Sequence, residues 1–381
     1  MKKLLFTLAL ISAAGSITHA QRMPPPEDQR KVQVAILFDT SGSMDGLIDQ
    51  AKSRIWNIIL EISRLQYNGQ QPTLEIALYQ YGNDGLAASD NYIEQVLDLS
   101  SDLDVLSQKL FALHTNGGSE YCGAVIGRSL DDLKWSDHPN DLRMIYIAGN
   151  EPFNQGPVDF HIECKKAAGR DVFINTIYCG DYQQGIREGW QDGSLCTQGD
   201  YFNINSNEKI VQIVTPYDDM ITKYNDSLNS TYYGYGELGM RRNSAQKEED
   251  MNAATQSPSA AAERTIVKSK KGSYSNESWD LVDGVAKGEV DILELEESEL
   301  PEEFRGKTEA EKIALLDEKT KEREIYQAKI GQLAIDREAY IQAELKKRAE
   351  AGDEVDDFGT SVNKSINEKA EKIGFVKEAH N

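Results

Sequence analysis

Residues that bind soft metals or build disulfide frameworks are scarce in this sequence, which has four cysteines and five histidines among 381 residues. The cysteines match no zinc-ligand spacing and the histidines are scattered, so a zinc site is not indicated. Four cysteines allow three disulfide pairings, and the sequence alone does not choose among them. Pairing Cys179 with Cys196 closes the shortest loop and is slightly preferred. Four reduced, buried thiols, with Cys122 and Cys164 included, are the alternative.

Basic side chains are also few. The 41 lysines and arginines face 63 aspartates and glutamates, which gives a formal net charge of -22. A chain of this charge repels phosphate backbones, so nucleic acid is a poor partner. The acidic balance suits divalent cations and basic surfaces, and it is also ordinary for a soluble exported protein.

Long apolar runs are absent beyond residue 20, where nothing approaches the roughly 18 uninterrupted apolar residues of a transmembrane helix. Residues 1–20 have a short basic head, an apolar stretch and small residues at the end, the pattern of a secretory signal peptide. We therefore expect an exported protein, periplasmic or extracellular, that is soluble after cleavage and has no transmembrane segment.

Apolar strands alternate with amphipathic helices in the first two thirds of the chain, which predicts an α/β fold with a doubly wound, mostly parallel sheet. The expected organisation is a signal peptide (1–20), a flexible lead-in (21–30), the α/β domain (31–235), a linker or mixed segment (236–290) and an acidic, mainly helical C-terminal region (291–381). Strands are expected at 31–38, 73–81, 143–148, 171–178 and 201–204. Helices are expected at 47–65, 102–113, 122–133, 158–169, 208–228 and 308–351.

The first strand is followed at once by Asp39-Thr40-Ser41-Gly42-Ser43. One carboxylate and two hydroxyls, spaced two residues apart on a tight loop, can direct their oxygens to one point. Hard cations such as Mg²⁺ prefer oxygen ligands and keep several waters, so such a site leaves a coordination position open. In a parallel sheet, this loop lies at the edge where binding sites form.

The Asp-x-Ser-x-Ser pattern after an apolar strand resembles the metal-ion-dependent adhesion site of von Willebrand factor type A (VWA) domains. The resemblance covers about residues 31–235 and implies two further ligand loops. In the second, Gly117-Gly118-Ser119-Glu120 corresponds to the family's Gly-Gly-Thr segment, with Ser119 as the natural hydroxyl ligand and Thr115 and Glu120 as weaker candidates. Capping of the following helix by Ser119 and Glu120 is the alternative.

The third loop departs from the family pattern, because Gly149 stands where the family has an aspartate ligand. Asn150, Glu151 or water would then supply the missing oxygen. The resemblance implies Mg²⁺, or Mn²⁺ or Ca²⁺, as the cofactor. Losing a carboxylate would weaken cation binding, but a cation with less of its charge neutralised would attract an acidic ligand more strongly.

These observations predict a non-enzymatic, metal-ion-assisted module that binds a protein partner, whose acidic side chain completes the metal site. One alternative is a metal-free scaffold that makes its contacts through the helical extension. The other is a hydrolase that uses the metal or His114. The sequence contains neither a phosphate-binding loop nor a G-x-S-x-G motif.

Overall fold

The sheet at the centre of the molecule is built around strand β1 (Lys31–Asp39), which is buried along nearly its whole length. The computed structural model describes residues 29–204, 213–270, 273–274, 276–352 and 358–378. The predicted signal peptide and nearly all of the predicted lead-in lie outside these described residues.

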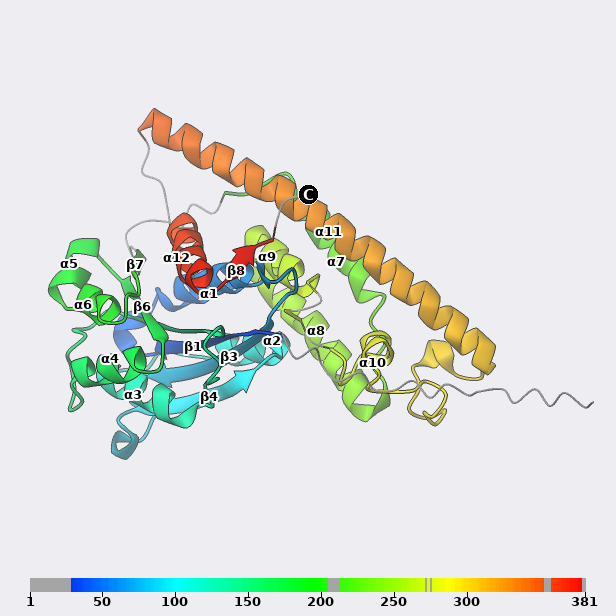
Figure 1. Cartoon of the computed structure of the whole chain (residues 1–381), viewed down its shortest axis with the longest axis horizontal. Coiled ribbons are helices and arrows are strands. Elements are labelled where there is room, and N and C mark those ends of the chain that lie inside the picture. The colour runs from blue at the N-terminus through cyan, green and yellow to red at the C-terminus, as the bar shows by residue number, and fades with distance from the viewer. Residues whose placement is uncertain (1–28, 205–212, 271–272, 275, 353–357, 379–381) are drawn as a thin grey trace, which may run out of the picture.

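Six strands lie side by side in the order β4-β3-β1-β5-β6-β7 (Figure 1). Their pairing is parallel except between β3 and β4, which are antiparallel. The chain therefore moves outward from β1 in both directions, which confirms the predicted doubly wound, mostly parallel sheet. The remaining strands of this sheet are β3 (Thr73–Tyr81), β4 (Ile93–Ser100), β5 (Leu142–Gly149), β6 (Val172–Cys179) and β7 (Tyr201–Ile204).

Helices cover both faces of the sheet. Alternate residues of β1 point to opposite faces, so Val34 and Ile36 belong to one core cluster while Ala35 and Leu37 belong to the other. By the same alternation, Asp39 at the end of β1 points to the second face. The first face carries α1 (Ile48–Ile62) and α2 (Leu103–Phe111), and the second carries α3 (Cys122–Asp132), α4 (Phe160–Ala168), α5 (Tyr182–Arg187) and α6 (Trp190–Leu195).

The sequence pattern does not predict β4, α5 or α6. Strand β4 lies at the sheet edge and is mostly half-buried or exposed, so it lacks a clear hydrophobic alternation. Helices α5 and α6 have six residues each, too few to show a helical period. The predicted helix 208–228 begins outside the described residues, and the structure shows α7 (Asp218–Asn229).

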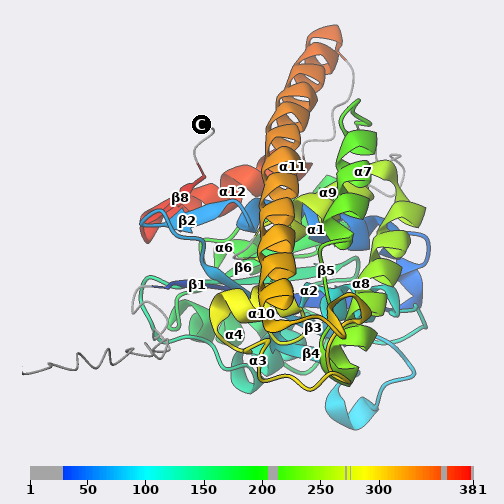
Figure 2. The same ribbon diagram turned by 90° about the vertical axis from the view of Figure 1, so that its right-hand side faces the viewer.

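The second half of the chain is helical and packs on the α1 face of the sheet domain (Figure 2). Helix α9 contacts α1 and α7, and its residues from Ser259 to Lys268 are all buried. Residues 236–290 therefore contain packed helices, although the domain boundaries remain a prediction. The elements of this half are α8 (Gly236–Gln256), α9 (Pro258–Lys268), α10 (Leu281–Lys287), α11 (Glu309–Ala351), α12 (Phe358–Lys372) and β8 (Phe375–Lys377).

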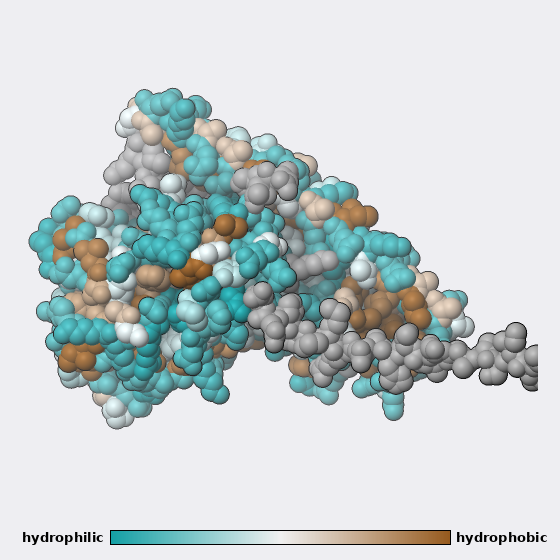
Figure 3. All heavy atoms as spheres, in the orientation of Figure 1, coloured by the Kyte–Doolittle hydropathy of each residue, from teal (hydrophilic) through white to brown (hydrophobic). Residues whose placement is uncertain are grey.

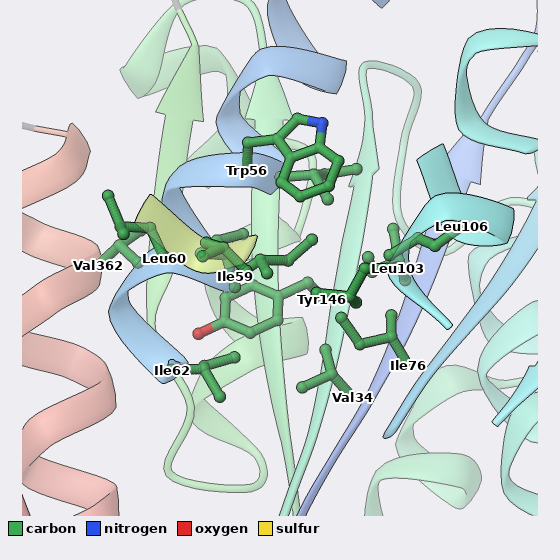
Figure 4. Close-up of a cluster of buried hydrophobic side chains, with 14 of the residues drawn as sticks. Val34, Trp56, Ile59, Leu60, Ile62, Ile76, Leu103, Leu106, Tyr146 and Val362 are labelled. Atoms are coloured by element: carbon green, nitrogen blue, oxygen red, sulfur yellow. The ribbon is translucent and has the colours of Figure 1, made fainter. Parts of the chain in front are cut away.

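The C-terminal elements contribute to the core of the sheet domain. Figure 4 shows Tyr146 of β5 among apolar side chains of α1, with Val362 of α12 entering from the side. Both side chains are almost completely buried. Strand β8 also pairs, antiparallel, with the short strand β2 (Leu65–Tyr67) that follows α1. Residues 358–377 are thus part of the same packed unit.

Helix α11 is 43 residues long and begins with a capping box, in which Thr308 and Glu311 each satisfy the other's backbone N–H. It ends at Gly352, which has a positive φ of 79°. The helix packs on α7 and α9, as expected for a solvated helix leaning on the first domain. Figure 3 shows a largely hydrophilic surface on this side of the molecule, in keeping with its net charge.

Three buried arginines fix the helical half to the rest of the molecule, and we call them the arginine anchors: Arg264, Arg323 and Arg337. Arg323 projects from α11 and bonds to Asp280 at 2.6 Å and to the hydroxyl of Thr231 at 3.1 Å. Asp280 is fully buried, so its charge depends on this arginine. The other anchors bond in the same way, Arg264 to Asp104 and Asp250 and Arg337 to Asp218 and Glu263.

One disulfide joins Cys164 of α4 to Cys196, the residue that ends α6. The preferred pairing of Cys179 with Cys196 is therefore wrong. The reason is strand alternation: Tyr178 points to the α4 and α6 face of β6, so Cys179 points to the opposite face. Cys122 and Cys179 are free and buried.

Within the described ranges, no helix is both long enough and apolar enough to cross a bilayer.

We predict that Arg323→Met lowers the free energy of unfolding by about 3–5 kcal/mol, because it leaves the buried charge of Asp280 uncompensated. Urea denaturation followed by circular dichroism measures this loss. Lys346→Met, at an exposed position of the same helix, is the matched control and should change stability by less than about 0.5 kcal/mol. Equal stabilities of the two variants would contradict an anchoring role.

We also predict that peptide mapping of the non-reduced protein recovers Cys164 linked to Cys196. Cys122 and Cys179 should react with an alkylating reagent only after unfolding, because both thiols are buried. Recovery of a peptide that links Cys179 to Cys196 would contradict the observed packing of β6.

Candidate metal site at the sheet edge

The candidate site begins at Asp39, the last residue of β1, whose side chain is completely buried. Its Oδ1 accepts a hydrogen bond from the backbone N–H of Ser41 at 2.7 Å. Its Oδ2 is buried and has no hydrogen-bond partner among the described residues. Burial raises the pKa of Asp39 to about 7 against the opposing hydrogen bonds from Ser41, and the charges of Glu120 and Glu151 add to the rise.

Two serine hydroxyls extend from this carboxylate to the surface. The Oγ atoms of Ser41 and Ser43 are 2.8 Å apart. Ser43 donates its proton to Oδ1 of Asn150 at 2.8 Å. A hydroxyl oxygen has two lone pairs besides its proton, so the Oγ atoms of Ser41 and Ser43 can each still accept a cation. Ser41 is buried and Ser43 is exposed, so the site opens to solvent at Ser43.

Asn150, in the third loop, connects that loop to the first loop through two hydrogen bonds with Ser43. It accepts from Ser43 Oγ, and its Nδ2 donates to the backbone carbonyl of Ser43 at 3.0 Å. Its amide is therefore used to hold the loop. Glu151 is half-buried, and its backbone carbonyl accepts from Nε1 of Trp190 at 2.8 Å.

Glu120 lies on the same side of the site as Asp39 and Ser41. It is 6% exposed, and its backbone N–H donates to Oε1 of Gln155 at 2.7 Å. Burial raises the pKa of the Glu120 carboxyl, and hydrogen bonds, including one with Ser41, oppose that rise.

Gly82, the residue after β3, makes room for these carboxylates. A Cβ on Gly82 would lie 2.9 Å from Oδ1 of Asp39 and 3.0 Å from Cγ of Glu120. Gly82 also has a φ of +78°, which favours glycine. The missing side chain at this position is what lets the carboxylate of Asp39 and the side chain of Glu120 approach the same point.

The second loop is held against the first by backbone hydrogen bonds. Asn116 N donates to Thr40 O at 3.0 Å, and a Cβ on Gly118 would lie 2.0 Å from Gly82 O. Ser119 and Thr115 are half-buried in this loop. Neither forms a hydrogen bond with the carboxylate and hydroxyls of the first loop in the part of the chain that the structure describes, so their ligand roles stay predictions.

The alternative that Ser119 and Glu120 cap the following helix is wrong. Helix α3 begins at Cys122, its N-cap residue is Tyr121, and no side chain caps it. The glycines before Ser119 instead allow the loop to touch the backbone at Gly82.

The third loop cannot hold an aspartate at Gly149 as the family pattern does. A Cβ on Gly149 would lie 2.6 Å from the hydroxyl of Tyr81 and 3.0 Å from both Oδ2 of Asp39 and Cη2 of Trp190. Tyr81 donates to the carbonyl of Ala148 at 3.0 Å, which fixes its ring in this space. The family's carboxylate is thus absent, and aromatic side chains fill its place.

His114 lies on the surface in the second loop. Its backbone carbonyl accepts from Asn83 Nδ2 at 3.0 Å. In the described residues its ring bonds to no serine or aspartate, so the structure does not assemble a Ser-His-Asp triad around it.

The donor set fits a hard divalent cation. A buried carboxylate oxygen without a partner costs several kcal/mol unless its charge is neutralised or paired. No group of three or more His, Cys, Asp and Glu side chains able to hold a metal occurs in the described ranges. The serine hydroxyls beside Asp39 are therefore essential to any cation site, and oxygen donors of this kind suit Mg²⁺, Mn²⁺ or Ca²⁺.

Comparison with known proteins gives matches at the level of structure. No family model and no curated protein matches the chain. Among solved structures, the SpRpn10 VWA domain matches with 14% identity and a TM-score of 0.37, covering 50% of this chain and 94% of that one. The BatB protein of Bacteroides thetaiotaomicron matches with 14% identity and a TM-score of 0.36, covering 46% and 90%.

A third match is the matrix protein PTMP1 of the mussel byssus, in a structure titled as having a zinc-occupied MIDAS motif. Its identity is 10% and its TM-score 0.35, over 47% of this chain and 43% of that one. This chain therefore covers less than half of PTMP1. A solved VWA domain is therefore among the structures to which this chain is similar.

We predict that Gly149→Ala lowers the free energy of unfolding by about 1–3 kcal/mol, because the added methyl overpacks the space against Tyr81. Adding Tyr81→Phe should recover part of this loss, since it removes the atom nearest the new methyl. Gly331→Ala is the control: it is mid-helix, has open space around it and should be neutral or stabilising by up to about 1 kcal/mol. A Gly149→Ala variant as stable as wild type would contradict the filled pocket.

Proposed function

We propose that residues 31–235 form a VWA-type domain whose role is to bind a protein partner with the help of a divalent cation, without catalysis. The observation that carries the proposal is the carboxylate of Asp39, which is fully buried, has one unpartnered oxygen and lies beside two serine hydroxyls. The position of this group at the carboxyl end of the first inner strand supports it, because binding sites of such sheets form there.

Asp39, Ser41 and Ser43 would hold the cation, with the second loop completing the protein side through Ser119, Thr115 or Glu120. When bound, the cation supplies a positive centre with a free coordination position. Ser43 is exposed at the mouth of the site. A partner's aspartate or glutamate therefore has access to that position.

We further propose that the protein acts outside the cytoplasm, in the periplasm or at the cell surface. The signal-peptide pattern of residues 1–20 supports this. The disulfide between Cys164 and Cys196 does too, because such bonds persist in oxidising compartments.

A metal-free scaffold is the second candidate, and one observation favours it. The pKa of Asp39 is raised to about 7, so the buried side chain can be neutral without a cation. In that case α11, held in place by Arg323 and Arg337, would present the contact surface. We find no observation that favours a hydrolase.

We predict that isothermal titration with Mg²⁺ or Mn²⁺ gives binding heat for the wild-type protein and none for Asp39→Ala. The carboxylate is the charged ligand nearest the hydroxyls, so its removal leaves too few donors for a divalent cation. Asp45→Ala is the matched control, because Asp45 is an exposed acid of the same loop, and it should bind as wild type does.

Circular dichroism and urea denaturation establish that each variant is folded. Equal heats for wild type and Asp39→Ala would reject the metal site and favour the scaffold.

A further inference from the structure

We propose that Glu120 is the second carboxylate of the metal site, taking the place of the aspartate that is missing at Gly149. This inference rests on the proposed function, because it concerns which side chains hold the cation. It begins from the observation that the third loop has no room for a carboxylate at position 149, since Tyr81 and Trp190 fill the space beside Gly149.

Glu120 reaches the site from the second loop. Its side chain and that of Asp39 both lie about 3 Å from one point, the position of a Cβ on Gly82, with Cβ of Ser41 3.5 Å from the same point. Glu120 is also nearly as buried as Asp39, at 6% exposure. The contact on Glu120 is its Cγ, one bond from the carboxyl carbon, and the charge of Glu120 acts on Asp39. Two carboxylates this close and this buried repel each other unless a positive charge or shared protons compensate them.

The rival carboxylate and amide are less suited. Asn150 already uses both ends of its amide on Ser43. Glu151 is only half-buried on the loop after β5, whereas Glu120 is buried. Of these candidates, Glu120 lies nearest to the Gly82 position that Asp39 also touches.

A glutamate suits this position because of its length. The backbone N–H of Glu120 is fixed by Gln155, and its side chain extends from there to a hydrogen bond with Ser41. With Asp39 and Glu120 both ionised, a divalent cation is neutralised by the protein, as it would be by two aspartates. The site would thus retain two carboxylate charges, although Gly149 replaces the aspartate that the family has in the third loop.

The experiment measures Mn²⁺ affinity of the full chain by isothermal titration, with the electron paramagnetic resonance signal of free Mn²⁺ as a second readout. The variants are Glu120→Gln, which keeps the shape and removes the charge, and Glu151→Gln, its rival. Asp39→Ala tests the site itself. Asp84→Asn, an exposed acid on the neighbouring loop, measures the effect of losing any nearby charge.

We expect Glu120→Gln to weaken Mn²⁺ binding about tenfold or more, on the scale of losing a side chain that supports a metal. Glu151→Gln and Asp84→Asn should each weaken it by less than about threefold, as screened rim charges do. The Glu120→Asp variant should also bind Mn²⁺ less tightly than wild type, because its side chain is one methylene shorter and holds the carboxylate farther from the cation.

The outcomes separate the two proposals. If Asp39→Ala abolishes binding while Glu120→Gln binds within about twofold of wild type, the role of Glu120 is rejected and the metal site stands. If Glu151→Gln weakens binding and Glu120→Gln does not, the second carboxylate is Glu151. If wild type and Asp39→Ala bind alike, or wild type does not bind, the proposed function fails and this inference fails with it.

Discussion

Parallel pairing of β1 with β3 and β5 is the constraint on which the candidate site depends. Its register sets Asp39 beside Tyr81 and brings the end of β5 level with the end of β1. The carboxylate of Asp39 is thereby placed between two positions without side chains, Gly82 on one side and Gly149 on the other. A buried carboxylate fits at the carboxyl end of β1 only because both neighbouring positions, Gly82 and Gly149, are glycines.

Much of this arrangement could be predicted from the sequence, since buried strands and the Asp39 loop have strong local signals. The alternation along β1 also places Asp39 on the face that α3 covers, which is why Glu120 is close. The filling of the space at Gly149 could not be predicted, because it depends on a tyrosine and a tryptophan from distant segments that read as ordinary core residues. The disulfide was missed for a related reason: loop length favoured Cys179, whereas the side-chain direction on β6 decides the pairing.

The helical half shows how a region poor in large apolar residues still packs. Residues 241–275 contain few such side chains, yet α9 is buried from Ser259 to Lys268. Ion pairs inside the protein take the place of apolar contacts there, and Arg264, Arg323 and Arg337 are buried in them. Such pairs contribute less net stability than apolar packing, but removing one partner is costly, so each pair fixes one geometry of the helices.

The packing of α12 and β8 on α1 and β2 has a consequence for the order of folding. Val362 of α12 packs in the same core layer as helix α1, although it lies about 300 residues later in the chain. Contacts of such large sequence separation form slowly, because closing a long loop costs entropy before any contact is gained. A chain that is still being synthesised therefore lacks the part of this layer that α12 and β8 supply, and the layer reaches its final packing only after residues 358–377 have been made.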